Sequence, residues 1–427
     1  LTPTIIAKEA LRLLTNNLVM GNLVYRDYES EFPGAPKKGG SVQIRKAVKF
    51  KVAKTRIRST KTITEQYITL NVATQAHISW NFFSVDLTLT IEQYSERYIR
   101  PAAAALANSV DSDLCALYDD IPVQIFESTG HVEPHSFTIL GRAMQALDEE
   151  AVPPDDRVVV MNPGAHWSFA NALSNWNFKE GGEQALRKGF LGRIANAEVF
   201  MDQNIKVHSV GRWATDSAAA SSTARFGVHS TAVSAAGSGL PTGIAVGATQ
   251  NQVINLDGFN QTLAQTVLEV GDTFTIAGCN AVNPMSGEST GSLRSFVVTA
   301  SAVSLTMSTV EDEVAVSFAP EMIQTGPYAT VDTIPQLEAA VVVRGSPTKA
   351  YPQNLAFHKN AFALCMVPLE VPDGVWSSTA EQDGYSCRIV KDYDIDADSE
   401  IIRLDILYGV KTIYPEMAAR IMGAQQG

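Results

Sequence analysis

The chain has 427 residues and a formal net charge of −12, with 45% hydrophobic and 18% charged residues. This is an ordinary globular composition, long enough for one large domain or two to three smaller ones. No stretch approaches the eighteen or more consecutive apolar residues of a membrane span, and Lys8, Glu9 and Arg12 interrupt the start where a signal peptide needs apolar residues. We therefore expect no membrane partner and an origin in the cytoplasm.

The cysteines are Cys115, Cys279, Cys365 and Cys387, which are far apart and form no C-x-x-C pair. This spacing excludes a zinc knuckle and a thiol redox motif. We expect all four to be small buried side chains in a reducing compartment.

The chain opens with an amphipathic pattern. Ile6, Ala10, Leu13, Leu14 and Leu18 recur at helical intervals, so residues 3–22 are predicted to form a helical arm. The stretch "ESEFPGAPKKGGS" that follows has two prolines and three glycines, which is typical of a linker or sharp turn.

A strongly basic segment comes next. From Lys37 to Lys61 there are ten basic and no acidic residues, so subtracting this local +10 from −12 leaves −22 on the other 402 residues. Apolar residues alternate over 48–52 and again over 68–72, which predicts a long β-hairpin with a bulge or turn near Ala53. The basic residues would then cluster at its projecting end.

A long helix and an α/β segment are predicted next. Apolar residues from Ile91 to Leu117 are spaced three and four apart, which favours a helix of about thirty residues with a kink at Pro101. Residues 136–174 then have the pattern of a helix, the buried strand Val158–Met161 and a second helix that begins at Asn162 and Pro163.

Composition changes sharply between Ser217 and Val310, where only six of 94 residues are charged. Short alternating runs such as "DTFTIAG", "SFVVTA", "VSLTMS" and "EVAVSF" predict a compact β module inserted in a host domain. Near the end, alternation from Ile401 to Val410 predicts a long strand pair.

Three motifs suggest chemistry on spacing alone. "GESTG" matches the G-x-S-x-G nucleophile elbow at Ser289, but a strand-like run follows where a hydrolase needs a helix. "DYDIDADSE" lacks the glycine and glutamate of a calcium loop, and Pro134 prevents "HVEPH" from forming a helical metal motif. We expect no catalytic, metal or cofactor-binding residues.

The basic hairpin has two possible partners. A row of Lys and Arg on a ribbon would bind nucleic-acid phosphates with strong salt dependence. Only Phe50 and Tyr67 are available nearby for base stacking, however, and the acidic remainder of the chain would repel a polyanion. Contact with an acidic surface of another protein copy is therefore favoured, and nucleic-acid binding through residues 45–61 is the alternative.

Several local motifs resemble one family. "LANSVDSDL", "FLGRIANAEVF", "GDTFTIAG" and "LYGVKTIYPEM" occur in the order found in the P-22-like coat proteins of short-tailed phages, which are major capsid proteins of the HK-97-type fold. The resemblance implies an α+β chain with an N-terminal arm, an extended β-hairpin loop, a spine helix at about 90–120, peripheral and axial domains, and an inserted small β-barrel. The basic loop tip departs from the family pattern.

The resemblance also implies a division into domains. The expected segments are 1–34 for the arm, 35–80 for the extended loop, 81–160 for the peripheral domain with the spine helix, 161–225 and 345–385 for the axial domain, 226–344 for the inserted barrel, and 386–427 for the closing strands of the peripheral domain.

Function and partners follow from the same resemblance. It implies a subunit that self-assembles as hexamers and pentamers into an icosahedral virion shell, in the host cytoplasm, with a scaffolding protein and a portal. Packaged double-stranded DNA would be enclosed but not bound sequence-specifically, and no enzyme activity or cofactor is expected.

The candidate contact residues are two sets of opposite charge. The basic set in the extended loop is Arg45, Lys46, Lys49, Lys51, Lys54, Arg56, Arg58 and Lys61. The candidate acidic counterparts on a neighbouring copy are Asp392, Asp394, Asp396, Asp398, Glu400, Asp148, Glu149 and Glu150.

Overall fold

The computed structural model forms two compact units, each built from separate stretches of the chain. Unit 1 comprises Leu1–Ile44, Tyr67–Ala116 and Lys359–Ile413, and unit 2 comprises Arg45–Gln66, Leu117–His358 and Tyr414–Gly427. The structure describes residues 3–27, 40–50, 56, 65–83, 95–127, 131–174, 192–213, 226–228, 252–257, 266–303, 314–336, 339–372, 374–382, 384–394 and 399–424.

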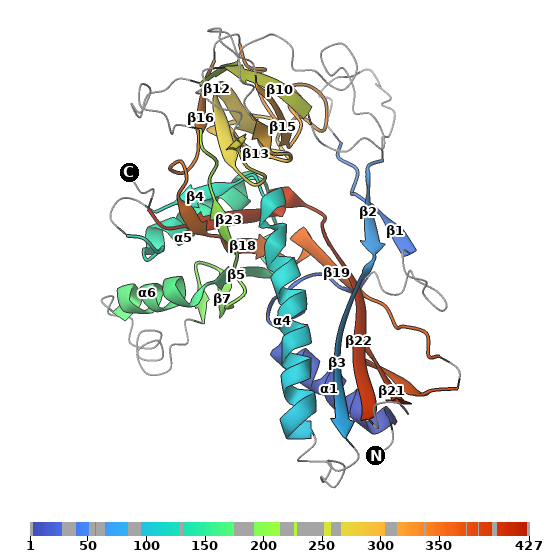
Figure 1. The fold of residues 1–427 in the computed structure, drawn as a ribbon. Coiled ribbons are helices and arrows are strands. Elements are labelled where there is room, and N and C mark those ends of the chain that lie inside the picture. Colours follow the sequence, from blue (N-terminus) through green and yellow to red (C-terminus); the bar gives the residue numbers. More distant parts are fainter. Residues whose placement is uncertain are drawn as a thin grey trace. The chain divides into compact units, whose positions relative to one another are not determined.

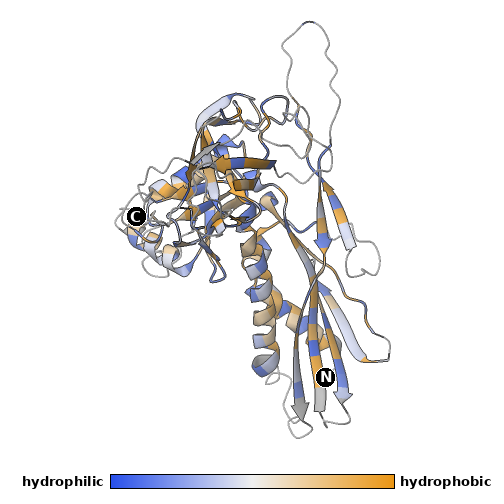
Figure 2. Ribbon diagram, turned by 45° about the horizontal axis from the view of Figure 1, so that its top comes forward, coloured by the Kyte–Doolittle hydropathy of each residue, from blue (hydrophilic) through white to orange (hydrophobic). Residues whose placement is uncertain are grey.

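Unit 1 is a five-stranded antiparallel sheet with helices packed on it (Figure 1). Its longest strand, β22, pairs with β3 from Ser399↔Phe83 to Tyr408↔Thr74 and with β19 from Tyr408↔Met366 to Thr412↔Phe362. Long strands of this sheet change repeatedly between hydrophobic and hydrophilic residues (Figure 2), as expected for strands with one buried face. The strands are β3 (Thr74–Phe83), β19 (Phe362–Met366), β20 (Trp376–Gln382), β21 (Tyr385–Asp394) and β22 (Ser399–Thr412).

The N-terminal helix α1 (Pro3–Asn17) confirms the predicted arm, and all five predicted apolar positions are buried. The short helix α2 (Met20–Leu23) follows it. The buried carboxylate of Asp111 accepts hydrogen bonds from the backbone N–H groups of Val19 and Gly21, at 2.7 and 2.9 Å. These bonds fix the chain between the two helices, where free N–H groups would otherwise lack acceptors.

The predicted long helix is present but is not a single α-helix. A π-helical turn, Ser95–Ile99, leads into α4 (Arg100–Ala116), and the 3₁₀ turn Leu117–Asp120 follows. Pro101, which has no N–H to donate, is the second residue of α4 and directly follows the π-helical turn. Helix α4 runs alongside β3 and β22 (Figure 1). Residues 90–94 lie outside the described part.

The expected long hairpin is described only in part. Among its described residues, β1 (Gly40–Arg45) pairs with β2 (Tyr67–Val72), and 46–50 form no strand where alternation predicted one. The ladder ends where the N–H of Lys46 donates to the carbonyl of Gln66 at 2.8 Å. Residues 74–80 belong to β3 and pair with β22. The division into domains stays a prediction.

The host part of unit 2 is a six-stranded mixed sheet covered by helices. Buried side chains from α5 (Phe137–Glu149) and α6 (Pro163–Ser174) pack with strand residues in one core. Ser136 caps α5, because its hydroxyl accepts the N–H of Ile139. In order across the sheet, the strands are β4 (Gln124–Phe126), β23 (Ala418–Met422), β18 (Asn354–His358), β5 (Arg157–Met161), β7 (Ala197–Met201) and β6 (Arg193–Ile194).

The predicted β module is a closed barrel within 226–343. Its core contains the rings of Phe274, Phe296 and Phe318, with centroids 5.3 to 5.9 Å apart, a spacing at which aromatic pairs attract. The barrel strands, in order, are β10 (Gln252–Asp257), β15 (Val314–Ala319), β13 (Ser289–Val298), β12 (Thr273–Val282), β16 (Ala340–Val343) and β9 (Phe226–Val228). Beside them lie the pairs β11 (Thr266–Leu268) with β14 (Ala302–Val303), and β8 (Val207–Ser209) with β17 (Ala350–Pro352).

Candidate subunit-contact site

The described part of the basic loop is its root, at the open end of the β1–β2 pair. Arg45, Lys46, Lys49 and Arg56 are described, and Arg56 is exposed. Arg45 forms an ion pair with Glu65 at 3.3 Å, with both side chains more than half exposed, so we expect it to contribute at most about 1 kcal/mol. The remaining predicted basic residues, Lys51, Lys54, Arg58 and Lys61, lie outside the described residues.

Lys46 differs from the other basic residues because it is buried, with 9% of its surface exposed. Its Nζ atom lies 5.3 Å from the centroid of the Tyr414 ring, within cation–π range. Burial lowers the pKa of this ammonium, and the nearby Glu416 carboxylate partly opposes that effect. Lys46 therefore anchors the loop instead of presenting its charge to solvent.

Two tyrosine hydroxyls accept hydrogen bonds from the backbone N–H groups of the loop where the pairing of β1 and β2 ends. The N–H of Ala47 donates to Tyr414 Oη at 3.4 Å, and the N–H of Lys49 donates to Tyr328 Oη at 3.3 Å. Strand pairing cannot continue here, because these donors face side chains instead of a partner strand. A cavity of about 100 Å³ at this root is also lined by Glu321 of the inserted module, so the module and the loop root share a surface in unit 2.

The first acidic set lies at the end of α5 and is engaged within its own unit. Asp148 accepts a hydrogen bond from Arg157 at 2.7 Å, and Glu149 accepts one from Gln145 at 2.8 Å. Glu150 forms an ion pair with Arg294, and both side chains are largely buried. Three of the predicted counterparts thus have partners in the same subunit.

The second acidic set lies at the β21–β22 hairpin of unit 1, where Asp394 pairs in register with Ser399. Asp392 is exposed, and its carboxylate accepts the N–H of Tyr393 at 2.9 Å. Glu400 is on β22, while Asp396 and Asp398 lie outside the described residues. Of the two acidic sets, this one has a described carboxylate available for another chain.

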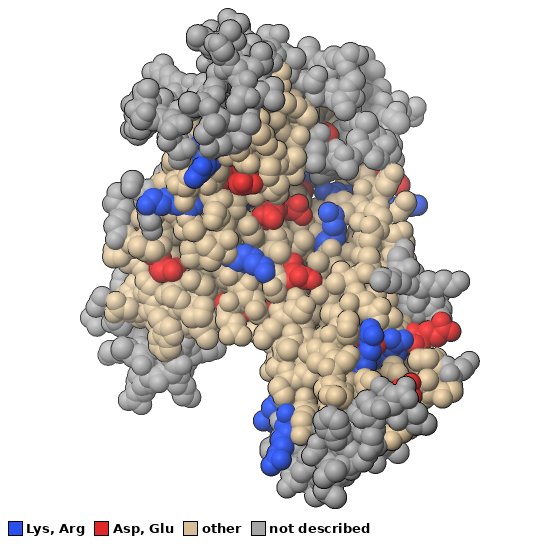
Figure 3. Space-filling model, in the orientation of Figure 1, with Lys and Arg blue, Asp and Glu red and all other residues tan. Residues whose placement is uncertain are grey.

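The face shown in Figure 3 has basic and acidic side chains interspersed among uncharged ones. The described surface on this face therefore lacks the large single-sign patch that a nucleic-acid groove requires.

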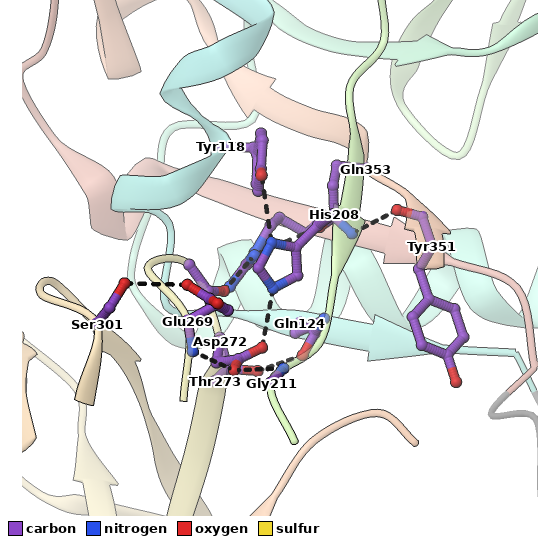
Figure 4. Close-up of polar contacts among 12 residues, drawn as sticks. Tyr118, Gln124, His208, Gly211, Glu269, Asp272, Thr273, Ser301, Tyr351 and Gln353 are labelled. Carbon is purple, nitrogen blue, oxygen red and sulfur yellow. Dashed lines mark hydrogen bonds and ion pairs between the residues drawn. The ribbon is translucent and has the colours of Figure 1, made fainter. Parts of the chain in front are cut away.

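A buried polar cluster joins the inserted module to its host, and no sequence motif pointed to it (Figure 4). Asp272 accepts hydrogen bonds from His208 Nε2 at 2.9 Å, the N–H of Gly211 at 3.0 Å and the N–H of Glu269 at 2.8 Å. The other ring nitrogen of His208 lies 3.2 Å from Tyr118 Oη.

Arg420 extends this cluster. It is fully buried and donates to the carbonyl of Gly271 at 2.8 Å, and burial lowers its pKa to about 10. Burial also raises the pKa of Tyr118 and of Asp119. Because His208 and Asp272 are 4% and 2% exposed, the cluster is closed to a substrate and instead fixes the module.

The other motifs have structural roles. Ser289 opens strand β13, where the nucleophile elbow needs a helix, and its hydroxyl donates to Asp332 at 2.9 Å. No group of three or more potential metal ligands occurs among the described residues, and no described helix is long and apolar enough to cross a membrane. None of the four cysteines forms a disulfide bond, and all four are buried.

Comparison with known proteins gives the class of the chain. A family model described as "P22 coat protein - gene protein 5" matches residues 2–423. The match defines a viral coat protein, a structural subunit of a shell. The chain belongs to the P22 coat protein family and is a major capsid protein of the tailed-phage type. The predicted α+β, HK-97-type fold and the capsid function are confirmed.

Solved capsid structures are similar at lower identity. The chain is 16% identical to a structure titled Mycobacterium phage Che8, covering 96% of this chain and 92% of that chain with a TM-score of 0.46. The chain is 11% identical to the capsid of cyanophage P-SCSP1u, and the match covers 96% of this chain and 89% of that chain with a TM-score of 0.46. The CUS-3 coat protein I-domain is 26% identical over 29% of this chain and 96% of that chain, with a TM-score of 0.19. No curated protein sequence matches. With TM-scores below 0.5, these structures add nothing to the family assignment.

Proposed function

We propose that the basic loop of this capsid protein is an inter-subunit contact that sets the register of neighbouring copies in the shell. The observation that carries the proposal is the anchored root. Burial of Lys46 and the bonds to Tyr414 and Tyr328 hold the base of the loop on unit 2, so its charged part leaves from a defined point. A fixed departure point reduces the conformational entropy that a contact at the tip must overcome.

The acidic counterpart we propose is the second set, Asp392 to Glu400. Asp148 and Glu150 already have cationic partners in their own subunit, and breaking a buried pair such as Glu150–Arg294 costs more than a surface pair returns. Exposed pairs contribute about 0.2 to 1 kcal/mol each, so the contact supplies orientation, and repetition over the shell supplies stability.

The finer roles implied by the family belong to the same proposal. The subunit would form hexamers and pentamers with a scaffolding protein and a portal, in the host cytoplasm, and would enclose DNA without catalysing a reaction. The acidic remainder of the chain favours this arrangement, because like charge keeps packaged DNA from adhering to the wall.

Charge reversal tests the loop. We expect the triple variant Lys54→Glu, Arg56→Glu and Arg58→Glu to keep the monomer's circular dichroism spectrum and to lose shells in sedimentation and electron microscopy. A matched control with the same charge change at exposed positions, Arg193→Glu, Lys349→Glu and Lys359→Glu, should still assemble. Normal shells from the loop variant would refute the proposal. If the loop binds nucleic acid instead, the wild-type monomer will retard DNA with an affinity that falls steeply with salt.

A further inference from the structure

A second cavity in unit 2, larger than the one at the loop root, has an unusual charge lining. It measures about 450 Å³, which is within the range of ligand pockets, and lies between α5 and β4 of the host and β12 and β13 of the barrel. Three arginines line it, Arg142, Arg294 and Arg344, against two acids, Glu149 and Glu150. The lining therefore has one excess positive charge on a chain of net charge −12.

Two of these guanidinium groups have no internal partner. Among the described residues, the side chains of Arg142 and Arg344 make no hydrogen bond or ion pair, whereas Glu149 is bonded to Gln145 and Glu150 to Arg294. Arg344 is half-buried, and burial lowers its pKa without an acidic group to oppose the effect. A half-buried charge without a counter-charge lowers the stability of the folded chain. Arg344 therefore does not stabilise the fold, and we expect it to bind a partner.

The rest of the lining indicates what kind of anion fits. Apolar side chains, including Ile125, Phe126 and the partly exposed Leu293, form the remaining wall. A free phosphate ion would leave this apolar surface unused. A DNA backbone, whose phosphates are likewise purely polar, would also leave it unused. A carboxylate side chain flanked by an apolar residue matches both halves of the wall, because guanidinium binds carboxylate through paired N–H donors.

We propose that this cavity, which we name the arginine pocket, is a docking site for an acidic peptide segment of a partner protein, with Arg142 and Arg344 binding its carboxylates. The site is separate from the contact proposed for the basic loop and does not depend on it.

The test measures peptide binding by fluorescence anisotropy to the unassembled full-length chain that carries Lys54→Glu, Arg56→Glu and Arg58→Glu, so that the basic loop cannot bind the probe. The probe is a labelled peptide, KDYDIDADSEI, which copies the acidic and apolar pattern of residues 391–401. The comparison peptide has Asn and Gln in place of its Asp and Glu residues. We expect the acidic peptide to bind and the neutral one not to bind. Loss of one charged hydrogen-bonding partner, in Arg344→Gln or in Arg142→Gln, should weaken binding about 10-fold or more.

The melting temperatures of the pocket variants distinguish a binding role of the arginines from a structural one. Because Arg344→Gln removes an uncompensated charge, its melting temperature should equal or exceed that of the wild type. Arg142 is exposed on α5, so Arg142→Gln keeps the test valid if the other variant misfolds. Arg193→Gln, an exposed change on β6 away from the pocket, should bind like the wild type.

Three outcomes would overturn the proposal. They are equal binding of the acidic and neutral peptides, unchanged binding in the folded pocket variants, and displacement of the peptide by inorganic phosphate at the peptide's own concentration.

Discussion

Neighbouring carboxylates at the end of α5 illustrate how burial decides the role of a charged residue. Asp148 and Glu150 are two positions apart and each contacts an arginine. The side chain of Asp148 is 66% exposed, whereas that of Glu150 is 13% exposed and faces Arg294, which is 7% exposed. Both carboxylates thus pair with a buried arginine, but Asp148 does so from the surface whereas Glu150 is itself buried.

Paired substitutions test this difference. We expect Glu150→Gln to lower the free energy of unfolding by about 3 kcal/mol, because it leaves the buried Arg294 without a counter-charge. Asp148→Asn should cost less, about 1 kcal/mol, because the buried Arg157 keeps its hydrogen bonds to the carbonyls of Val152 and Pro153 when it loses this exposed carboxylate. Urea unfolding monitored by circular dichroism measures both, and equal losses would contradict the assigned roles.

Lys46 provides a second test at the scale of single residues. Burial lowers the pKa of its ammonium below 10.5, and Glu416 raises it. Glu416→Gln should therefore lower the pKa of Lys46 further, as followed by NMR titration of its side chain. The matched control is Glu65→Gln, which removes the exposed partner of Arg45 and should leave the pKa of Lys46 unchanged. A rise in that pKa in the Glu416 variant would contradict the placement of Glu416.

The sign of the linkage follows from the direction of the shift. The unfolded chain binds the Lys46 proton more tightly than the folded chain does, so the folding cost is fully present below the folded pKa. It is relieved as pH rises from the folded pKa towards 10.5. Within that alkaline window, Lys46 contributes a stability that increases with pH.

Sequence patterns predicted apolar residues well and buried polar ones poorly. The periodicity of residues 3–22 identified five buried positions, four of them in α1, because a repeating face needs only local spacing. The cluster around Asp272 was missed, since it joins His208 to Asp272 across 64 residues and Gln124 to Thr273 across 149 residues. Gly271 and Asp272, directly before β12, were a weak signal for this cluster, because a glycine followed by an aspartate at the start of a strand is typical of a fixed turn.

At the scale of elements, strand ends depended on long-range bonds that alternation does not reveal. Alternating residues 48–52 predicted a continuing strand, but the N–H groups of Ala47 and Lys49 donate to tyrosine hydroxyls from distant segments. The β module was predictable because its core strands alternate in short runs that each bury one face. Closure into a barrel and the strand order were not, because they depend on pairing between runs.

The turn into β12 makes a prediction about an element. Gly271 has φ of +93°, and a Cβ atom there would lie 2.6 Å from Asp119 Oδ1. Gly271→Ala should lower the free energy of unfolding by about 3 kcal/mol, through backbone strain and this overlap. Gly278 has φ of +83° with no atom within 4 Å of its Cβ position, so Gly278→Ala should cost only about 1 to 2 kcal/mol. Equal melting temperatures for the two variants would show that the overlap is relieved without cost.

At the scale of the whole molecule, charge is divided between a basic segment and an acidic remainder, and every copy of the chain carries both. In a shell of identical subunits, each contact of the kind we propose would join the basic segment of one copy to an acidic surface of another. A change of sign on both partners therefore restores attraction in every contact at once.

A charge swap within one chain uses this property. The loop variant Lys54→Glu, Arg56→Glu and Arg58→Glu should fail to assemble, and adding Asp392→Lys, Asp394→Lys and Glu400→Lys should restore shells. Adding Asp148→Lys and Glu149→Lys instead should not restore them, because those carboxylates already have partners in their own subunit. Sedimentation and electron microscopy measure recovery, and circular dichroism confirms that each variant is folded. Recovery with the α5 set, or with neither set, would place the acceptor surface elsewhere. The screening length for exposed charges is about 8 Å at physiological salt and shortens as salt is added. Restored shells, like those of the wild type, should therefore dissociate more readily as the salt concentration is raised.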